Sequence, residues 1–213
     1  MKKICKYQHL KCTFWILVAA IIVLIISLIE PNSPWNSILQ NIFAGLVTGV
    51  VVTLISSLKN KELKDVDIEY QFLKIIHDLY ISSRREYTEY RKMRYEKDDV
   101  YSSEAYELIS ELQAIESFIE SKDKDERLAG IIGMKPSIFF DDEKDYSLAD
   151  QKVKHDVLYN RLNSKLTYNE EERKIIDQQI EALRRAHRIV NLKATKRMNE
   201  IFNEKIEIET SVP

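Results

Sequence analysis

Residues 38–58 read ILQNIFAGLVTGVVVTLISSL and contain no Asp, Glu, Lys or Arg. A helix of this length covers roughly 31 Å, which matches a hydrocarbon core of about 30 Å. Residues 13–29, TFWILVAAIIVLIISLI, are equally free of charge and would cover roughly 25 Å. Because a backbone in lipid must satisfy its own hydrogen bonds, both segments are predicted to be transmembrane helices. A short loop joins them, so the sequence predicts a two-helix transmembrane hairpin.

The distribution of lysines around the two segments predicts their orientation. The loop, residues 30–37, has no Lys or Arg, whereas the flanks carry Lys2, Lys3, Lys6, Lys11, Lys59, Lys61 and Lys64. The positive-inside rule places the basic N-terminus (residues 1–12) and the C-terminus in the cytoplasm and the loop outside. A cleaved signal peptide is disfavoured, because the apolar run is long and no small-residue cleavage site follows it. We expect a double-pass protein of the plasma (inner) membrane, with the lipid bilayer as a partner.

The second segment differs from the first because small and polar residues share one side of it. On a helical wheel of 100° per residue they form a single arc: Asn41, Ala44, Gly45, Thr48, Gly49, Val52 and Ser56. Gly45 and Gly49 make a GxxxG pair, which allows close helix approach. This small-residue face would pack on the first segment, pack on copies of itself, or line an aqueous path in an oligomer. Neither segment has an ionisable residue, which argues against a proton relay.

Residues 59–205 are predicted to form a cytoplasmic, all-α domain. From residue 62 onward the chain holds 26 Lys and Arg against 33 Asp and Glu, with only two glycines and one internal proline. This shortage of turn residues favours long helices packed as a coiled-coil-like bundle. The last residues, 206–213, are expected to be a flexible tail.

Heptad-like spacing locates the helices of this domain. Two rows of mostly apolar residues, called seams below, have members three, four or seven residues apart, as on the buried face of a helix. The first seam is Tyr101, Ala105, Leu108, Leu112, Ile115 and Ile119. The second seam is Ile176, Ile180, Leu183, His187, Val190, Ala194 and Ile201. A further helix should continue from the second apolar segment to about Arg94. Capping pairs predict helix starts at Thr167 (with Glu170) and Ser147 (with Asp150). A short helix is expected over residues 125–134, followed by a loop over residues 137–146.

A basic stretch is the feature of the predicted domain that most strongly suggests a binding function. Residues 182–198, ALRRAHRIVNLKATKRM, contain no acid and carry Arg184, Arg185, Arg188, Lys193, Lys196 and Arg197. Such a stretch binds phosphates of nucleic acid, a nucleotide or anionic lipid in some proteins. The alternative is a solvated face that complements the acidic helix over residues 98–126. The net negative charge of the domain makes nucleic acid an unlikely principal partner.

The sequence offers no pattern typical of catalysis or of cofactor or metal binding. The four histidines, His9, His77, His155 and His187, form no HxxxH, HExxH or Glu-x-x-His pair. There is no glycine-rich phosphate loop and no nucleophile elbow. We therefore expect no enzyme activity, no cofactor and no metal, and we interpret His187 as a seam residue.

Two functions fit these observations. The first is a membrane-anchored helical interaction or scaffold protein that presents its cytoplasmic bundle to a protein partner. The second is an oligomeric, membrane-perturbing effector of a bacterial toxin or phage-defence system, with the bundle as its sensor. The small-residue face discriminates between them, because only the second function requires close helix approach there.

Overall fold

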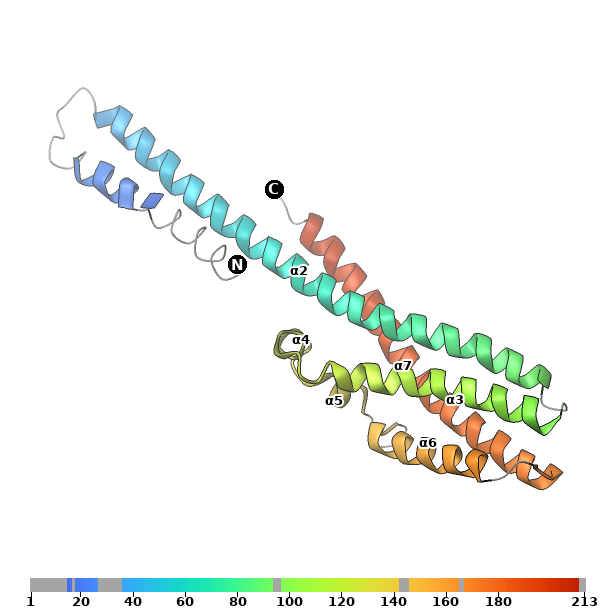
Figure 1. The fold of residues 1–213 in the computed structure, drawn as a ribbon. Coiled ribbons are helices and arrows are strands. Elements are labelled where there is room, and N and C mark those ends of the chain that lie inside the picture. The colour runs from blue at the N-terminus through green and yellow to red at the C-terminus, as the bar shows by residue number, and fades with distance from the viewer. Residues whose placement is uncertain are drawn as a thin grey trace. The chain divides into compact units, whose positions relative to one another are not determined.

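The structure is a computed structural model that describes residues 15–16, 18–26, 36–93, 97–141, 146–164 and 167–210. Every regular element within these ranges is a helix, which confirms the predicted all-α class. In chain order they are α2 (Asn36–Met93), α3 (Asp98–Ser121), α4 (Glu126–Ile132), α5 (Pro136–Phe140), α6 (Leu148–Asn163) and α7 (Glu170–Thr210), all labelled in Figure 1. Residues 18–26 are also helical.

The chain divides into two compact units, residues 1–63 and residues 64–213. The helix α2 belongs to both, because it is unbroken over 58 residues from Asn36 to Met93. The predicted continuation of the second apolar segment into a charged helix is therefore confirmed. The observed boundary between the units falls a few residues after the predicted domain start at residue 59.

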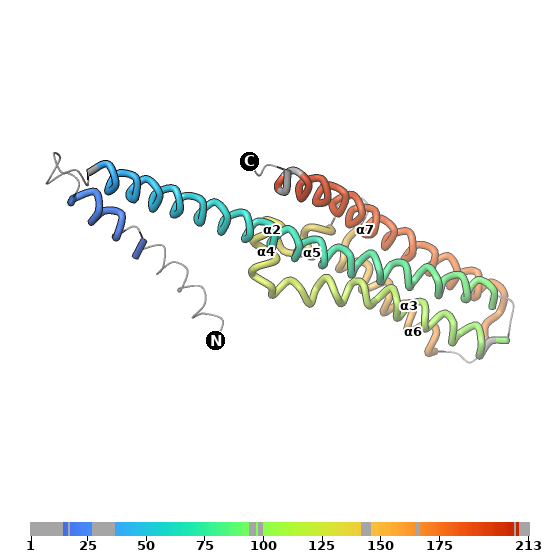
Figure 2. Tube along the Cα trace, turned by 90° about the horizontal axis from the view of Figure 1, so that it is seen from above, coloured from blue at the N-terminus to red at the C-terminus, as the bar shows by residue number. Residues whose placement is uncertain are grey.

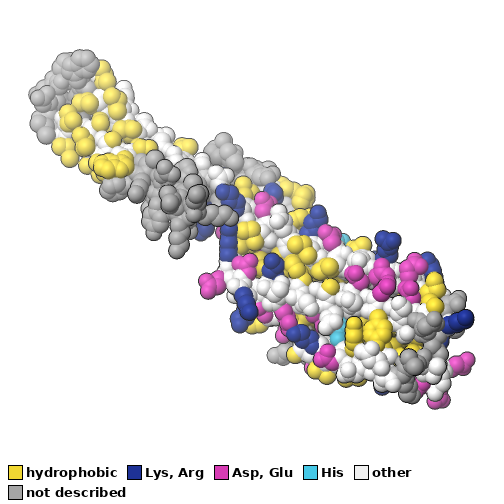
Figure 3. Space-filling model, in the orientation of Figure 1, with side chains coloured by type: hydrophobic (Ala, Val, Ile, Leu, Met, Phe, Trp, Pro, Cys, Tyr) yellow, Lys and Arg dark blue, Asp and Glu magenta, His cyan; other side chains and the backbone are white. Residues whose placement is uncertain are grey.

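The first unit contains one helix that is long and apolar enough to cross a membrane among the described residues, and that helix is α2. Its side chains over residues 37–58 are mostly exposed, and Figure 3 shows apolar side chains covering this end of the helix. The first predicted segment falls partly outside the described residues, as does most of the loop over residues 30–37. The hairpin and its orientation therefore stay predictions.

The second unit is a four-helix bundle of α3, α6, α7 and the part of α2 after Lys64. Within this unit the helices α2 and α6 run in one direction, and the helices α3 and α7 run in the opposite direction, as Figures 1 and 2 show. All residues of the two predicted seams are buried, which confirms their role as core positions. Fully buried side chains such as Leu112 and Ile180 bring these helices together, because burying one large aliphatic side chain contributes about 1.5–3 kcal/mol.

The core of the bundle consists of two apolar clusters that follow each other along its length. The first cluster includes Phe72 and Ile76 of α2, and the second includes Leu108 of α3. On α2 and α6 the chain passes from the first cluster to the second, whereas on α3 and α7 it passes from the second to the first. This order agrees with the alternating helix directions.

The helix starts are only partly where the capping patterns predict them. Ser147 caps α6 by accepting a hydrogen bond from the backbone N–H of Asp150, as expected. The predicted Thr167–Glu170 pair is wrong, because α7 begins at Glu170 and the capping box is formed by Asn169 and Glu172. In that box each side chain accepts from the backbone N–H of the other residue, at 2.8 and 3.1 Å.

Two segments expected to be irregular contain helix. Residues 137–146 were predicted as a loop, but Pro136 starts the short helix α5, where its fixed φ suits the first helical turn. The Asp123 carboxylate accepts a hydrogen bond from the Ser137 backbone N–H (2.9 Å), and Phe140 is buried in the first cluster. At the other end of the chain, α7 continues to Thr210, so residues 206–210 of the expected flexible tail are helical.

Candidate functional site

The small-residue face of α2 is exposed along its whole length. All seven of its residues, Asn41, Ala44, Gly45, Thr48, Gly49, Val52 and Ser56, are solvent-accessible in the structure. The less exposed positions of the same segment are Leu39, Phe43, Leu46 and Val50. At 100° per residue, the centres of these two faces lie roughly 160° apart around the helix. The small-residue face is therefore on the opposite side from the partly covered face.

Among the described residues, no other part of the chain approaches the two glycines of this face closely. A Cβ added to Gly45 or Gly49 would meet none of their atoms within 4 Å, apart from the helix's own backbone. The Thr53 hydroxyl, nearby on the helix, donates to the Gly49 carbonyl at 2.7 Å and so satisfies itself within the helix. The interpretation that this face packs inside the hairpin gains no support from the described residues.

The basic stretch lies on α7, and its first arginine is held by neighbouring side chains. The Arg184 guanidinium contacts the Glu181 carboxylate through Nε (3.1 Å) and Nη2 (2.9 Å). It also stacks over the Tyr87 ring at 4.3 Å, while the Tyr87 hydroxyl donates to Glu181 at 2.8 Å. Hydrogen bonding from Arg184 is the main reason that the pKa of Glu181 falls to about 2. Arg185 lies 3.5 Å from the same carboxylate.

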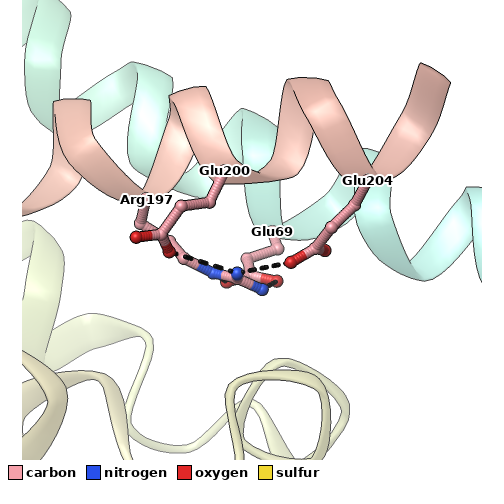
Figure 4. A network of polar contacts seen from close by, with 4 residues as sticks. All are labelled: Glu69, Arg197, Glu200 and Glu204. Carbon is pink, nitrogen blue, oxygen red and sulfur yellow. Dashed lines mark hydrogen bonds and ion pairs between the residues drawn. The ribbon is translucent and has the colours of Figure 1, made fainter. Parts of the chain in front are cut away.

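The last arginine of the stretch joins α7 to α2, as Figure 4 shows. Arg197 Nε lies 2.7 Å from Glu69 Oε1, and its Nη2 lies 3.1 Å from Oε2, which is a bidentate pair. Its Nη1 contacts Glu204 at 2.8 Å and Glu200 at 3.5 Å. Glu69 is buried, so Arg197 neutralises a carboxylate that water does not reach.

The remaining cations of the stretch differ in their surroundings. Lys193 lies over the Phe139 ring at 5.0 Å, whereas Arg188 and Lys196 are exposed. The six basic side chains therefore do not form one uniform anion site. Arg184, Arg185 and Arg197 contact carboxylates of α2 and of α7 itself, rather than those of the acidic helix α3.

A pocket of about 580 Å³ between α2 and α7 is lined by part of this surface. Its walls include Arg91 and Arg185, together with the carboxylates of Asp177 and Glu181. The Tyr90 hydroxyl donates a hydrogen bond to Asp177. Because both signs of charge line the pocket, it is not selective for anions.

The sequence pattern did not reveal a second arrangement, a polar layer in the core of the bundle. Ser83 of α2, Glu116 of α3, His155 of α6 and His187 of α7 are all buried. Ser83 and His155 lie between the two apolar clusters along their helices, and Glu116 and His187 directly follow the first residue of the first cluster on α3 and on α7. The Ser83 hydroxyl donates to the Tyr80 carbonyl at 2.8 Å, so that member of the layer is satisfied by its own helix.

The other three members of the layer converge on one another. His155 Nε2 and His187 Nε2 each lie 3.1 Å from Glu116 Oε1. The three ligating atoms all lie within 4.8 Å of one another, and the exposed fraction of each side chain is at most 1%. Burial alone would raise the pKa of the Glu116 carboxyl, but the two imidazoles outweigh burial and hold that pKa below its usual value.

Several polar atoms of this cluster have no hydrogen-bond partner among the described residues. They are both carboxylate oxygens of Glu116, both ring nitrogens of His155 and Nε2 of His187. Only Nδ1 of His187 is engaged, with the Leu183 carbonyl at 2.8 Å. Buried polar atoms are nearly always paired in folded proteins, so this group requires an explanation.

Spacing within a single helix could not have revealed this cluster, because its three residues come from three helices. In the sequence, Glu116 is one acid among many on α3, and His155 has no ligand-like neighbour. One feature of the sequence did point to a buried polar site: His187 occupies a position in an otherwise apolar seam. The expectation of no metal site rested on local spacing alone and did not consider such a convergence.

No protein-family model, curated protein or solved structure matches this chain. Its function must therefore be argued from the residues themselves.

Proposed function

We propose that this protein is a membrane-anchored helical module whose bundle presents a binding surface to a protein partner. The observation that carries the proposal is the unbroken helix α2. Its first part exposes a charge-free apolar surface, and its later part contributes Phe72 and Ile76 to the core of the bundle. Exposed apolar surface of this extent is stable in lipid rather than in water.

The proposed topology follows the lysine distribution. Residues 13–29 form a second span, both termini lie in the cytoplasm, and the bundle is cytoplasmic. The absence of charge from both segments supports spanning over lying flat at the surface, where a helix needs a charged face.

An apolar groove between α6 and α7 supports the existence of a partner-binding surface. The groove has a volume of about 270 Å³ and is lined by Val153 and Val157 of α6 and by Leu183 of α7. The exposed fractions of Val153 and Val157 are 62% and 47%. Two exposed valines on one helix face, one turn apart, give a partner helix an apolar stripe to contact.

Cysteine labelling tests the anchoring and the topology. In a Cys5→Ser/Cys12→Ser background, Ser33→Cys should react with an impermeant maleimide in intact cells, whereas Ser82→Cys should react only after lysis. The protein should also stay with the membrane fraction after alkaline carbonate extraction. Release by carbonate, or labelling of both positions from outside, would contradict the proposed topology.

Photo-crosslinking tests the binding surface. A photoreactive amino acid placed at Val153 should give a discrete adduct in cells, and Val157→Asp should abolish it. The same probe at Arg188, which is exposed on α7, is the matched control. If neither position gives a specific adduct, or both give the same ones, the groove is not a partner site.

The uncovered small-residue face favours a second candidate function, an oligomeric membrane-perturbing effector. Gly45 and Gly49 face away from the partly covered side of α2, so a second copy of the helix can approach them. The native mass of the full-length protein in mild detergent should exceed that of a monomer. Gly49→Leu should return it to the monomer and abolish liposome leakage, whereas Val47→Leu, on another side of the helix, should change neither. A monomeric wild type would exclude this function.

A further inference from the structure

We propose that Glu116, His155 and His187 bind a divalent first-row transition-metal ion in the core of the bundle. The inference does not depend on the membrane proposal, because all three residues belong to the unit of residues 64–213. Two imidazoles and one carboxylate form a donor set found at zinc and at non-haem iron(II) centres.

The distances between the three ligand atoms are compatible with a shared ion. Metal bonds of about 2.0–2.1 Å in tetrahedral geometry place two ligand atoms about 3.3 Å apart. Both imidazole Nε2 atoms lie 3.1 Å from Glu116 Oε1. Despite this proximity none of the three atoms has a hydrogen-bond partner among the described residues, and a common ion would satisfy all of them.

The tautomer of His187 also suits metal binding. Its Nδ1 lies 2.8 Å from the Leu183 carbonyl oxygen, and a carbonyl only accepts, so Nδ1 carries the proton. In the neutral ring this tautomer has its lone pair on Nε2, which faces Glu116. A backbone carbonyl that fixes the tautomer of a ligating histidine is a frequent outer-shell partner of metal sites.

Two more unpartnered oxygen atoms belong to residues close to the three ligands. The Tyr146 ring lies edge-on to the His187 ring, with centroids 6.2 Å apart, and its buried hydroxyl has no partner among the described residues. Gln151, one turn before His155 on α6, is buried and its Oε1 also lacks a partner. One of these oxygens, directly or through a water, would complete four-coordination.

The site has a route to solvent as well as three protein ligands. A pocket of about 290 Å³ includes His155 in its lining, beside Gln113 and Tyr159. Through this pocket an ion would approach the site from the His155 side. Once bound, it would join α3, α6 and α7 at the boundary between the two apolar clusters.

The test uses the full-length chain in mild detergent, with Cys5→Ser and Cys12→Ser introduced because these cysteines, near His9, would bind zinc independently. The protein is stripped with a chelator and dialysed, and zinc is added at micromolar concentration. We expect about one bound ion per chain by elemental analysis. Cobalt(II) should give visible d–d absorption, and X-ray absorption at the zinc edge should show nitrogen and oxygen ligands with imidazole scattering.

Two variants and a matched control locate the ion. Glu116→Gln and His155→Gln should each weaken zinc binding about 100-fold or more, since removing even an outer-shell partner typically costs about 10–100-fold. His77→Gln is the control, because His77 contacts Asn191 at 2.9 Å, outside the layer. Circular dichroism at 222 nm identifies any variant that fails to fold. If both variants fail to fold, the cobalt and X-ray spectra of the parent protein decide whether imidazole and oxygen ligands bind the ion.

Two results would overturn the proposal. One is a parent protein that binds much less than one ion per chain, which would leave the layer as a purely structural polar group. The other is stoichiometric binding that survives in folded Glu116→Gln and His155→Gln, which would place the ion elsewhere. Zinc and iron(II) are distinguished by elemental analysis of protein purified without chelator.

Discussion

Removal of the Arg197 side chain tests whether the bidentate pair in Figure 4 stabilises the bundle. Arg197→Ala leaves the Glu69 carboxylate, whose side chain is only 5% exposed, without its cation. Breaking a fully buried ion pair costs about 3–5 kcal/mol. Because the Arg197 side chain is 27% exposed, water softens the loss, and we expect about 2–3 kcal/mol.

Thermal unfolding of the full chain in mild detergent, followed at 222 nm, measures this cost. For a domain of about 150 residues, 1 kcal/mol shifts Tm by about 2–4 °C, so Arg197→Ala should lower Tm by roughly 5–10 °C. Arg188→Ala, an exposed arginine on the same helix, should change Tm by no more than about 1–2 °C.

A double variant separates two quantities: the free-energy cost of leaving Glu69 unpaired, and the net contribution of the Glu69–Arg197 ion pair to stability. Glu69→Leu/Arg197→Leu removes both charges, and we expect it to be less destabilised than Arg197→Ala alone. If Arg197→Ala unfolds at the same temperature as Arg188→Ala, the pair contributes nothing and the reasoning is refuted. If the double variant is the least stable of the three, packing of the long side chains, rather than charge, explains the effect.

Three further predictions concern the rest of the bundle. The low pKa of Glu181 means that its ionised form stabilises the fold above about pH 4.5, so the Tm advantage over Glu181→Gln should disappear as the pH falls from 5 towards 2. Leu112→Ala should cost about 2–5 kcal/mol in urea denaturation, against about 0.5 kcal/mol or less for the exposed Val153→Ala. Asn169→Ala should cost about 1 kcal/mol by the same assay, whereas Thr167→Ala should be neutral.

Much of the bundle could be predicted because its signals are periodic. The seams on α3 and α7 repeat every three or four residues, and a buried helix face must have that period. The continuity of α2 across Lys59 was predictable for a related reason, since no proline or glycine interrupts it there. The start of α7 was missed because Thr167 and Asn169 are both good N-caps, and only the choice of partner, Glu170 or Glu172, decides between them.

The short helix α5 was missed because its stabilising contacts are not local. It has only five residues, too few to show a period, and proline commonly ends helices as well as starting them. What fixes it is the hydrogen bond from Ser137 to Asp123 and the burial of Phe140. Both depend on the path of the chain after α3, which no sequence window contains.

The candidate sites were harder still to predict wherever their residues come from different helices. The small-residue face of α2 could be derived from the sequence, because all its members lie on one helix. The basic stretch was also visible, but its arginines had no predictable partners: Glu69 precedes Arg197 by more than 100 residues. The polar layer depends on the positions of three helices at once, so no pattern in the sequence connects Glu116 with His155 and His187.

The energetic cost of burying the polar layer bears on whether the layer has a binding role. Replacing buried charged groups by apolar ones of similar size is often neutral or stabilising by about 1–4 kcal/mol. A bundle selected only for stability would therefore gain from leucines at Glu116, His155 and His187, since both apolar clusters would then merge into one core. We expect the triple leucine variant to melt at or above the Tm of the chelator-treated parent, and to lose the zinc-dependent rise in Tm that the parent should show. A triple variant that melts far below the metal-free parent would mean that the layer stabilises the fold without an ion, and the case for a binding role would lose its energetic basis.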